Sequence, residues 1–126
     1  MKASAGLTIA LCSGVVLGAA TIQALHAQAR PVAYTIAEFE VNNADKFKAY
    51  GDATTAQIPR AGGKFVARGG KTFVVAGDAP KRVVIVEWPS LEKAQAYFES
   101  AEYKQLVAIR DENSKFRSFV IEGLER

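Results

Sequence analysis

Cysteine and histidine are almost absent from this chain of 126 residues, which contains one of each. Both of them, Cys12 and His26, lie within the first 29 residues, so the chain from Arg30 onward has neither. For that part of the chain, this excludes disulfides, thiol nucleophiles, zinc sites of cysteine or histidine, and haem held by histidine. It also removes the side chain that titrates nearest to neutral pH. We therefore expect no metal and no cofactor.

Charge is scarce at the beginning of the sequence, where Lys2 is the one charged residue before Arg30. An apolar run follows, and the segment ends with Ala27 and Ala29 on either side of Gln28. This pattern is typical of a secretory signal peptide cut after Ala29. It predicts a leader over residues 1–29, one domain over 30–126, and a periplasmic or secreted location. The alternative is an uncleaved anchor, because the run approaches the length that spans a bilayer. The protein would then meet the membrane only through this segment.

Clusters of basic residues are also missing. The chain has 16 lysines and arginines against 13 acidic residues, and the removal of residues 1–29 would leave 15 against 13. These basic residues are scattered singly, whereas a nucleic-acid-binding surface normally shows a patch or a stripe of them. The sequence therefore predicts a solvated, mildly basic surface and no nucleic-acid partner.

The remainder of the chain shows the periodicity of alternating strands and helices. We expect strands over residues 31–41, 64–68, 71–76, 82–88 and 116–122, and helices over 44–58, 91–98 and from 101 through 110. Segment 71–76 would extend the preceding strand past a bulge or pair with it in a hairpin. The order βαββαβ predicts an α+β, ferredoxin-like fold, an antiparallel four-stranded sheet with two helices on one face. Since these helices cover one face, the other is expected to pair with a second copy in a homodimer.

Four charged side chains converge in this topology. Glu38 lies late in the first strand, Arg68 ends the second, and Arg82 and Arg117 begin the last two. The strand directions place all four at one end of the sheet, although the sequence leaves open which of them share a face. Three guanidinium groups around one carboxylate suit an anionic ligand that carries a carboxylate or a phosphate. The alternative is that these charges are solvated or paired with one another.

Aromatic residues give a second set of candidates for ligand binding. Tyr34 and Trp88, together with Tyr97 and Tyr103, could line an apolar pocket. The alternative is that they lie in the core or at an interface, since aromatic side chains bury large areas there.

Several segments resemble a known family. They are residues 62–71 (GGKFVARGGK), 80–91 (PKRVVIVEWPSL), 100–103 (SAEY) and 120–124 (VIEGL). With these segments the chain is similar, over residues 32–124, to the domain-of-unknown-function 1330 family of the dimeric α/β-barrel superfamily. One departure is Ala76, where such proteins often carry an acidic residue. The resemblance implies a ferredoxin-like domain that forms a dimeric α/β barrel, but no activity.

Three functions remain open from the sequence. The first is an exported dimeric domain that binds a small anionic or aromatic molecule. The second is a cofactor-independent enzyme like the monooxygenases and lactone isomerases of the same superfamily, and in the absence of histidine its base would be Glu38 or Glu87. The third is a structural dimer without a ligand. The fold alone does not decide among them.

Overall fold

The computed structural model describes residues 30–125. The predicted leader, with Ala27 and Ala29, lies outside these residues. The elements are β1 (Ala33–Val41), α2 (Ala44–Arg60), β2 (Lys64–Arg68), β3 (Arg82–Trp88), α3 (Leu91–Phe98), α4 (Ala101–Lys104), α5 (Val107–Asn113) and β4 (Ser114–Glu122). No helix within the described part of the chain is long and apolar enough to cross a membrane.

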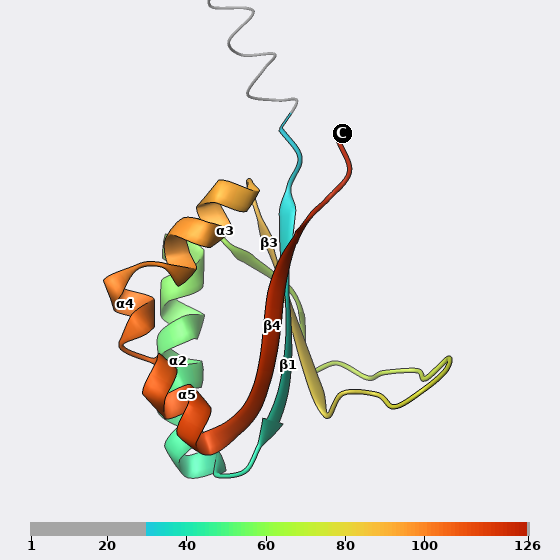
Figure 1. Ribbon diagram of the computed structural model, residues 1–126, viewed down its shortest axis with the longest axis vertical. Helices are drawn as coiled ribbons and strands as arrows, with labels where there is room; N and C mark the ends of the chain where they lie inside the picture. The colour runs from blue at the N-terminus through green and yellow to red at the C-terminus, as the bar shows by residue number, and fades with distance from the viewer. Residues whose placement is uncertain (1–29, 126) are drawn as a thin grey trace, which may run out of the picture. The chain divides into compact units, whose positions relative to one another are not determined.

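The four strands form one antiparallel sheet in the order β2-β3-β1-β4, which is the ferredoxin-like topology. The prediction of this fold is confirmed, and β3 is a central strand, as its β-branched residues on both faces indicate. All the helices lie on one side of the sheet (Figure 1). The other side, called the open face below, is not covered by any element among the described residues.

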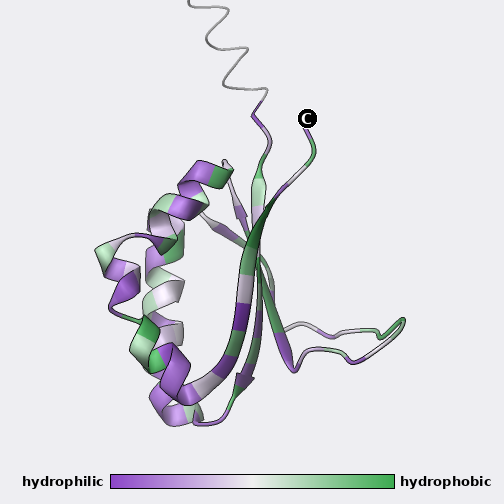
Figure 2. Cartoon of the chain, in the orientation of Figure 1, coloured by the Kyte–Doolittle hydropathy of each residue, from purple (hydrophilic) through white to green (hydrophobic). Residues whose placement is uncertain are grey.

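Alternation along the strands separates the two faces (Figure 2). In β1 the buried residues Ala33, Thr35, Ala37 and Phe39 point toward the helices, while Tyr34, Ile36 and Glu38 point to the open face. Because residues paired across neighbouring strands share a face, the register extends this assignment to β3 and β4. Arg82 therefore lies on the helix side and Arg117 on the open face.

Local signals set the starts of the helices. The side chain of Asn43 accepts a hydrogen bond from the backbone N–H of Lys46, and Ser90 and Ser100 do the same for Lys93 and Tyr103. Such caps satisfy backbone donors that the first turn leaves free. The single helix expected after Ser100 is instead divided into α4 and α5. The backbone N–H of Leu106 bonds the carbonyl of Tyr103 across a tighter, three-residue turn.

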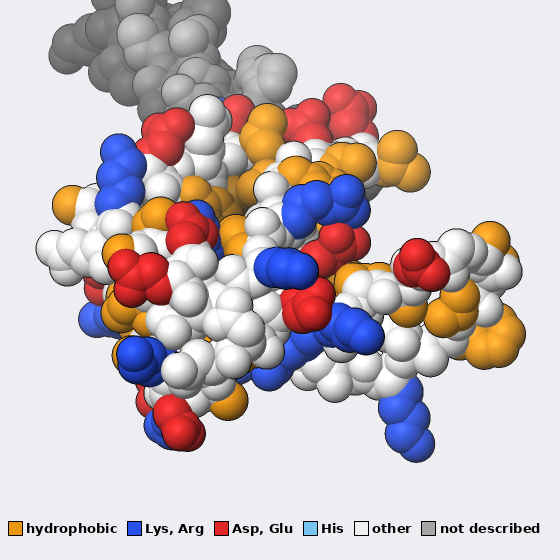
Figure 3. Space-filling model, turned by 60° about the horizontal axis from the view of Figure 1, so that its bottom comes forward, with side chains coloured by type: hydrophobic (Ala, Val, Ile, Leu, Met, Phe, Trp, Pro, Cys, Tyr) orange, Lys and Arg blue, Asp and Glu red, His pale blue; other side chains and the backbone are white. Residues whose placement is uncertain are grey.

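The expected strand over residues 71–76 is not formed. Residues 69–81 make a projecting loop, called the arm below, which leaves the body on the open-face side (Figure 1). Phe73 and Val75 near its end are 91% and 90% exposed. Figure 3 shows hydrophobic side chains on the arm, beside a band in which basic and acidic side chains alternate. The segment has the composition of a strand, but none of the four strands in the described part of the chain pairs with it.

An irregularity in β2 lies close to the arm. Phe65 pairs with Val86 and Ala67 pairs with Ile85, so Val66 is an extra residue, a β-bulge. Beyond the bulge Arg68 pairs with Val84. Phe65 and Arg68 consequently both face the helices.

The core lies between the helices and the sheet around Trp88, which is fully buried. Its ring stacks on Tyr97 with 5.5 Å between the ring centroids, and its indole N–H donates a hydrogen bond of 2.8 Å to Thr35 Oγ1. Gly63 sits against this cluster. A Cβ atom at Gly63 would lie 2.6 Å from Ile58 and 3.0 Å from Val86, so the close approach of β2 requires glycine there.

Candidate functional site

A cavity of about 500 Å³ lies between α2 and the sheet. Its walls are largely apolar, and their larger members are Phe39, Phe47, Ile58, Phe65, Val86 and Phe116. Tyr50, Thr54 and Ile58 reach it from one face of α2 because they are spaced four residues apart. The volume and the apolar lining are those of a small-molecule site.

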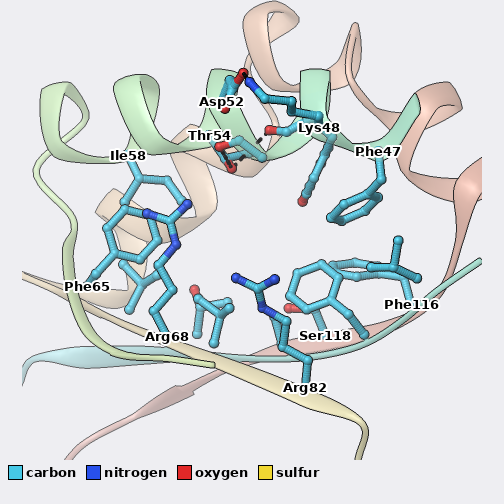
Figure 4. A pocket seen from close by; sticks show the side chains of 18 of the residues that line it. Phe47, Lys48, Asp52, Thr54, Ile58, Phe65, Arg68, Arg82, Phe116 and Ser118 are labelled. Carbon is cyan, nitrogen blue, oxygen red and sulfur yellow. Dashed lines mark hydrogen bonds and ion pairs between the residues drawn. The ribbon is translucent and has the colours of Figure 1, made fainter. Parts of the chain in front are cut away.

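Two arginines stand in the cavity wall. Arg68 and Arg82 both rise from the sheet, and Figure 4 shows their guanidinium groups directed toward α2 and the interior. Arg68 pairs with Val84, and Arg82 lies two residues before Val84 in the same strand. The two are thus diagonal neighbours on adjacent strands, a backbone spacing of about 7–8 Å. Long side chains at this spacing can converge on one anionic group.

The two guanidinium groups differ in their contacts. Arg68 donates a hydrogen bond to the Thr55 hydroxyl, and its guanidinium carbon lies 4.7 Å from the centroid of the Phe65 ring. Among the described residues, no group accepts a hydrogen bond from Arg82 and none forms an ion pair with it. A full charge in this position has its donors available for a ligand.

Gly69 supports the placement of Arg82. It has a φ of 64°, in the left-handed region, and a Cβ atom there would lie 3.3 Å from Arg82 Nε. Glycine at this first residue of the arm therefore allows the turn and leaves space for the arginine.

The other charges at the rim largely cancel. Lys48 and Asp52, one helical turn apart on α2, form an ion pair of 2.6 Å, and Asp45 is the remaining acid that lines the cavity. The charged lining residues are then three basic and two acidic ones. The excess positive charge comes from the sheet, at Arg68 and Arg82.

The four charged residues that the sequence brings to one end of the sheet divide between its faces. Arg68 and Arg82 line the cavity, whereas Glu38 and Arg117 lie on the open face. There Arg117 Nε donates a hydrogen bond of 2.8 Å to Glu38 Oε2. The sheet therefore separates the arginine pair from the only carboxylate of the predicted set.

Of the remaining predicted site residues, Tyr103 alone lines the cavity. Tyr34 lies on the open face, where its hydroxyl donates a 3.4 Å hydrogen bond to Glu87 Oε1. Trp88 is a core residue, as described above, and Tyr97 packs on it. Tyr103 is the one aromatic residue of the predicted group that borders the cavity. The carboxylates of Glu38 and Glu87, the two candidate bases, are both on the face away from it.

Sequence reasoning missed the aromatic wall formed by Phe39, Phe47, Tyr50, Phe65 and Phe116. The signal that could have found part of it is the helical spacing of Phe47, Tyr50 and Thr54, which puts these residues on the inner face of α2. No group of three or more acidic, cysteine or histidine side chains suited to a metal occurs among residues 30–125.

Together, the sheet order, the single helix layer and the cavity define a ferredoxin-like α+β domain with a small-molecule-sized cavity. The model of the family described as Domain of unknown function (DUF1330) matches residues 32–124. The chain belongs to this family, which confirms the resemblance seen in its sequence. No curated protein matches the chain significantly.

Solved structures share the fold at low sequence identity. A protein of unknown function from Rhodopseudomonas palustris has a TM-score of 0.62 and 19% identity, over 77% of this chain and 85% of that one. A cofactor-independent oxygenase from Streptomyces nogalater has a TM-score of 0.53 and 15% identity, over 76% and 96%. A dimeric ferredoxin-like protein of unknown function from Thermobifida fusca has a TM-score of 0.51 and 16% identity, over 75% and 92%. At these identities the similarity shows the fold alone.

Proposed function

We propose that the protein binds a small organic acid with an apolar or aromatic body, whose anionic group lies at Arg68 and Arg82. The observation that carries this proposal is the Arg82 guanidinium, which has no partner in the described part of the chain and points into an apolar cavity. An arginine stays charged at every relevant pH, and its planar fork binds a carboxylate through two hydrogen bonds.

Binding is favoured over base catalysis because of where the acids lie. The carboxylates proposed as bases, Glu38 and Glu87, are on the open face, and Glu38 is paired with Arg117. The similarity to a cofactor-independent oxygenase concerns the fold. The two carboxylates that line the cavity, Asp45 and Asp52, are exposed on α2, and Asp52 is paired with Lys48.

The experiment compares phenylbutyrate with its neutral amide by isothermal calorimetry. We expect the acid to bind and the amide to bind far more weakly, because the amide offers no charge to the two arginines. Arg82→Gln should weaken binding of the acid by roughly ten- to hundredfold, the value of one or two charge-assisted hydrogen bonds.

Arg60→Gln provides the matched control, since it removes the same charge from an exposed arginine that pairs with Glu102 outside the cavity. It should leave the affinity unchanged. Equal affinity for the acid and the amide would contradict the proposal. An equal loss of affinity for the acid in Arg82→Gln and Arg60→Gln would also contradict it. A protein that binds neither compound would favour a dimer without a ligand.

We also infer that the protein is a homodimer formed through the open face. Phe119 and Ile121 of β4 are about half exposed there, and the apolar end of the arm projects on the same side. A sheet with apolar residues on both faces needs cover on both, and this chain supplies helices for one. The dimeric relative of the same fold supports this arrangement.

The sequence pattern of the first 29 residues supports a proposal for the location of the protein. We infer export across the cytoplasmic membrane, with cleavage after Ala29, and therefore a periplasmic or secreted protein. Intact-mass measurement of the protein from the exported fraction should give a chain that begins at Arg30. A full-length species in the membrane fraction would instead support the anchor.

A further inference from the structure

Two buried tyrosines from different helices meet at the cavity. Tyr50 of α2 and Tyr103 of α4 are 5% and 4% exposed, and both border the cavity. Their hydroxyl oxygens lie 3.0 Å apart, so one of the two hydroxyls donates a hydrogen bond to the other.

Either hydroxyl could be the donor of this hydrogen bond, and Arg110 of α5 favours Tyr103 in that role. Its Nη1 lies 3.0 Å from the Tyr103 hydroxyl, and an arginine can only donate. Its Nε donates to Asp111, and its guanidinium carbon lies 4.3 Å from the centroid of the Phe116 ring, so Arg110 is held in place. A hydroxyl that accepts a hydrogen bond from a cation is a stronger donor. The donor sequence from Arg110 through Tyr103 to Tyr50 is therefore the favoured arrangement.

One of the two tyrosine hydroxyl protons is not used in a hydrogen bond among the described residues. The two hydroxyls carry two protons, and the hydrogen bond between them uses one. Among the described residues, neither hydroxyl has any further hydrogen-bond partner. In the favoured direction, from Tyr103 to Tyr50, the remaining proton is on Tyr50, which lines the cavity.

Burial raises the pKa of Tyr50 above its usual value. Tyr50 therefore keeps its proton at any physiological pH. Its hydroxyl is a neutral donor, which suits a neutral oxygen acceptor, whereas the arginines Arg68 and Arg82 suit the anionic group.

We propose that the Tyr50 hydroxyl selects ligands that carry a carbonyl or other acceptor oxygen on the apolar body, away from the acidic group. This inference rests on the proposed function and narrows the ligand class from organic acids to oxo acids and similar molecules. Such a ligand satisfies a buried donor that a plain hydrocarbon chain would leave without a partner, and that loss is costly in an apolar site.

The test compares benzoylpropionate with phenylbutyrate, which differ by a carbonyl in place of a methylene group. We expect the wild-type protein to bind the oxo acid about three- to tenfold more tightly, the contribution of one neutral hydrogen bond. Tyr50→Phe should abolish this preference, which is measured as the ratio of the two dissociation constants within the same variant.

Two control variants sharpen the result. Tyr97→Phe removes another partly buried hydroxyl, which already donates to Gln57 and does not border the cavity, so the preference should remain. Tyr103→Phe should also keep a preference, because Tyr50 retains its free proton. Circular dichroism would show that each variant is folded.

The outcomes separate this inference from the proposed function. If both acids bind the wild-type protein equally, or if Tyr50→Phe keeps the preference, the proposed role of Tyr50 is wrong. The proposed anion site at Arg68 and Arg82 is not affected by that result. If the preference disappears only in Tyr103→Phe, the assignment to Tyr50 is wrong. If neither acid binds, the proposed function fails, and this inference fails with it.

Discussion

Replacement of Trp88 with alanine should lower the free energy of unfolding by about 3–5 kcal/mol. The side chain is fully buried, stacks on Tyr97 and contacts the Phe98 ring edge-on at 5.9 Å between centroids. Its loss would leave a cavity in the core and would deprive the buried Thr35 hydroxyl of the donor that it now has. A domain of this size has a total stability of about 5–15 kcal/mol, so the variant should unfold near ambient temperature or in low denaturant.

Urea unfolding followed by circular dichroism measures this effect, since Trp88 is the only tryptophan and its fluorescence disappears with it. Trp88→Phe is the matched control. It keeps an aromatic ring but loses the hydrogen bond to Thr35, and we expect a smaller loss of stability with unchanged affinity for phenylbutyrate. A loss below about 1 kcal/mol in the alanine variant would show that Trp88 is not a core residue.

Lysine in place of Ile121 should convert the proposed homodimer to a monomer. Ile121 lies on the open face and is 53% exposed in the single chain. In a two-fold symmetric interface each substitution occurs twice, so two like charges would be buried without partners. Like charges across an interface cost several kcal/mol, which corresponds to a dissociation constant raised about a hundredfold or more.

Light scattering at micromolar concentration gives the mass of each form. Ala108→Lys adds the same charge to an exposed position of α5, on the helix side, and should leave the dimer intact. A wild-type protein with the mass of one chain would contradict the proposed dimer. An Ile121→Lys variant with the mass of two chains would show that the interface does not depend on β4.

The sequence was sufficient for the fold where local pattern and tertiary environment agree. The bounds of β3 are as predicted because β-branched residues fill both of its faces and strands cover both of its edges. Asn43, Ser90 and Ser100 cap helices as their residue types indicate. The prediction of a strand over residues 71–76 was wrong for the opposite reason. Its strand-like composition has no partner strand within one chain, and its apolar residues remain exposed.

The site was predicted in part. Topology correctly brought Glu38, Arg68, Arg82 and Arg117 to one end of the sheet, but it did not determine their faces. For Arg68 that depends on a bulge at Val66 that no local pattern reveals. The pair of Tyr50 and Tyr103 could not be found either, because a contact between residues 53 positions apart depends on how α2 and α4 pack.

The bulge in β2 also affects which sequence changes this protein can tolerate during evolution. Phe65 and Arg68 are three positions apart, and in a regular strand such residues point to opposite faces. The extra residue at Val66 allows both to reach the cavity. The deletion of one codon within β2 would therefore carry a positive charge through the sheet, while many substitutions at Val66 would leave that charge in place. Over evolutionary time we expect the length of β2 to be held more strictly than the identity of the bulged residue.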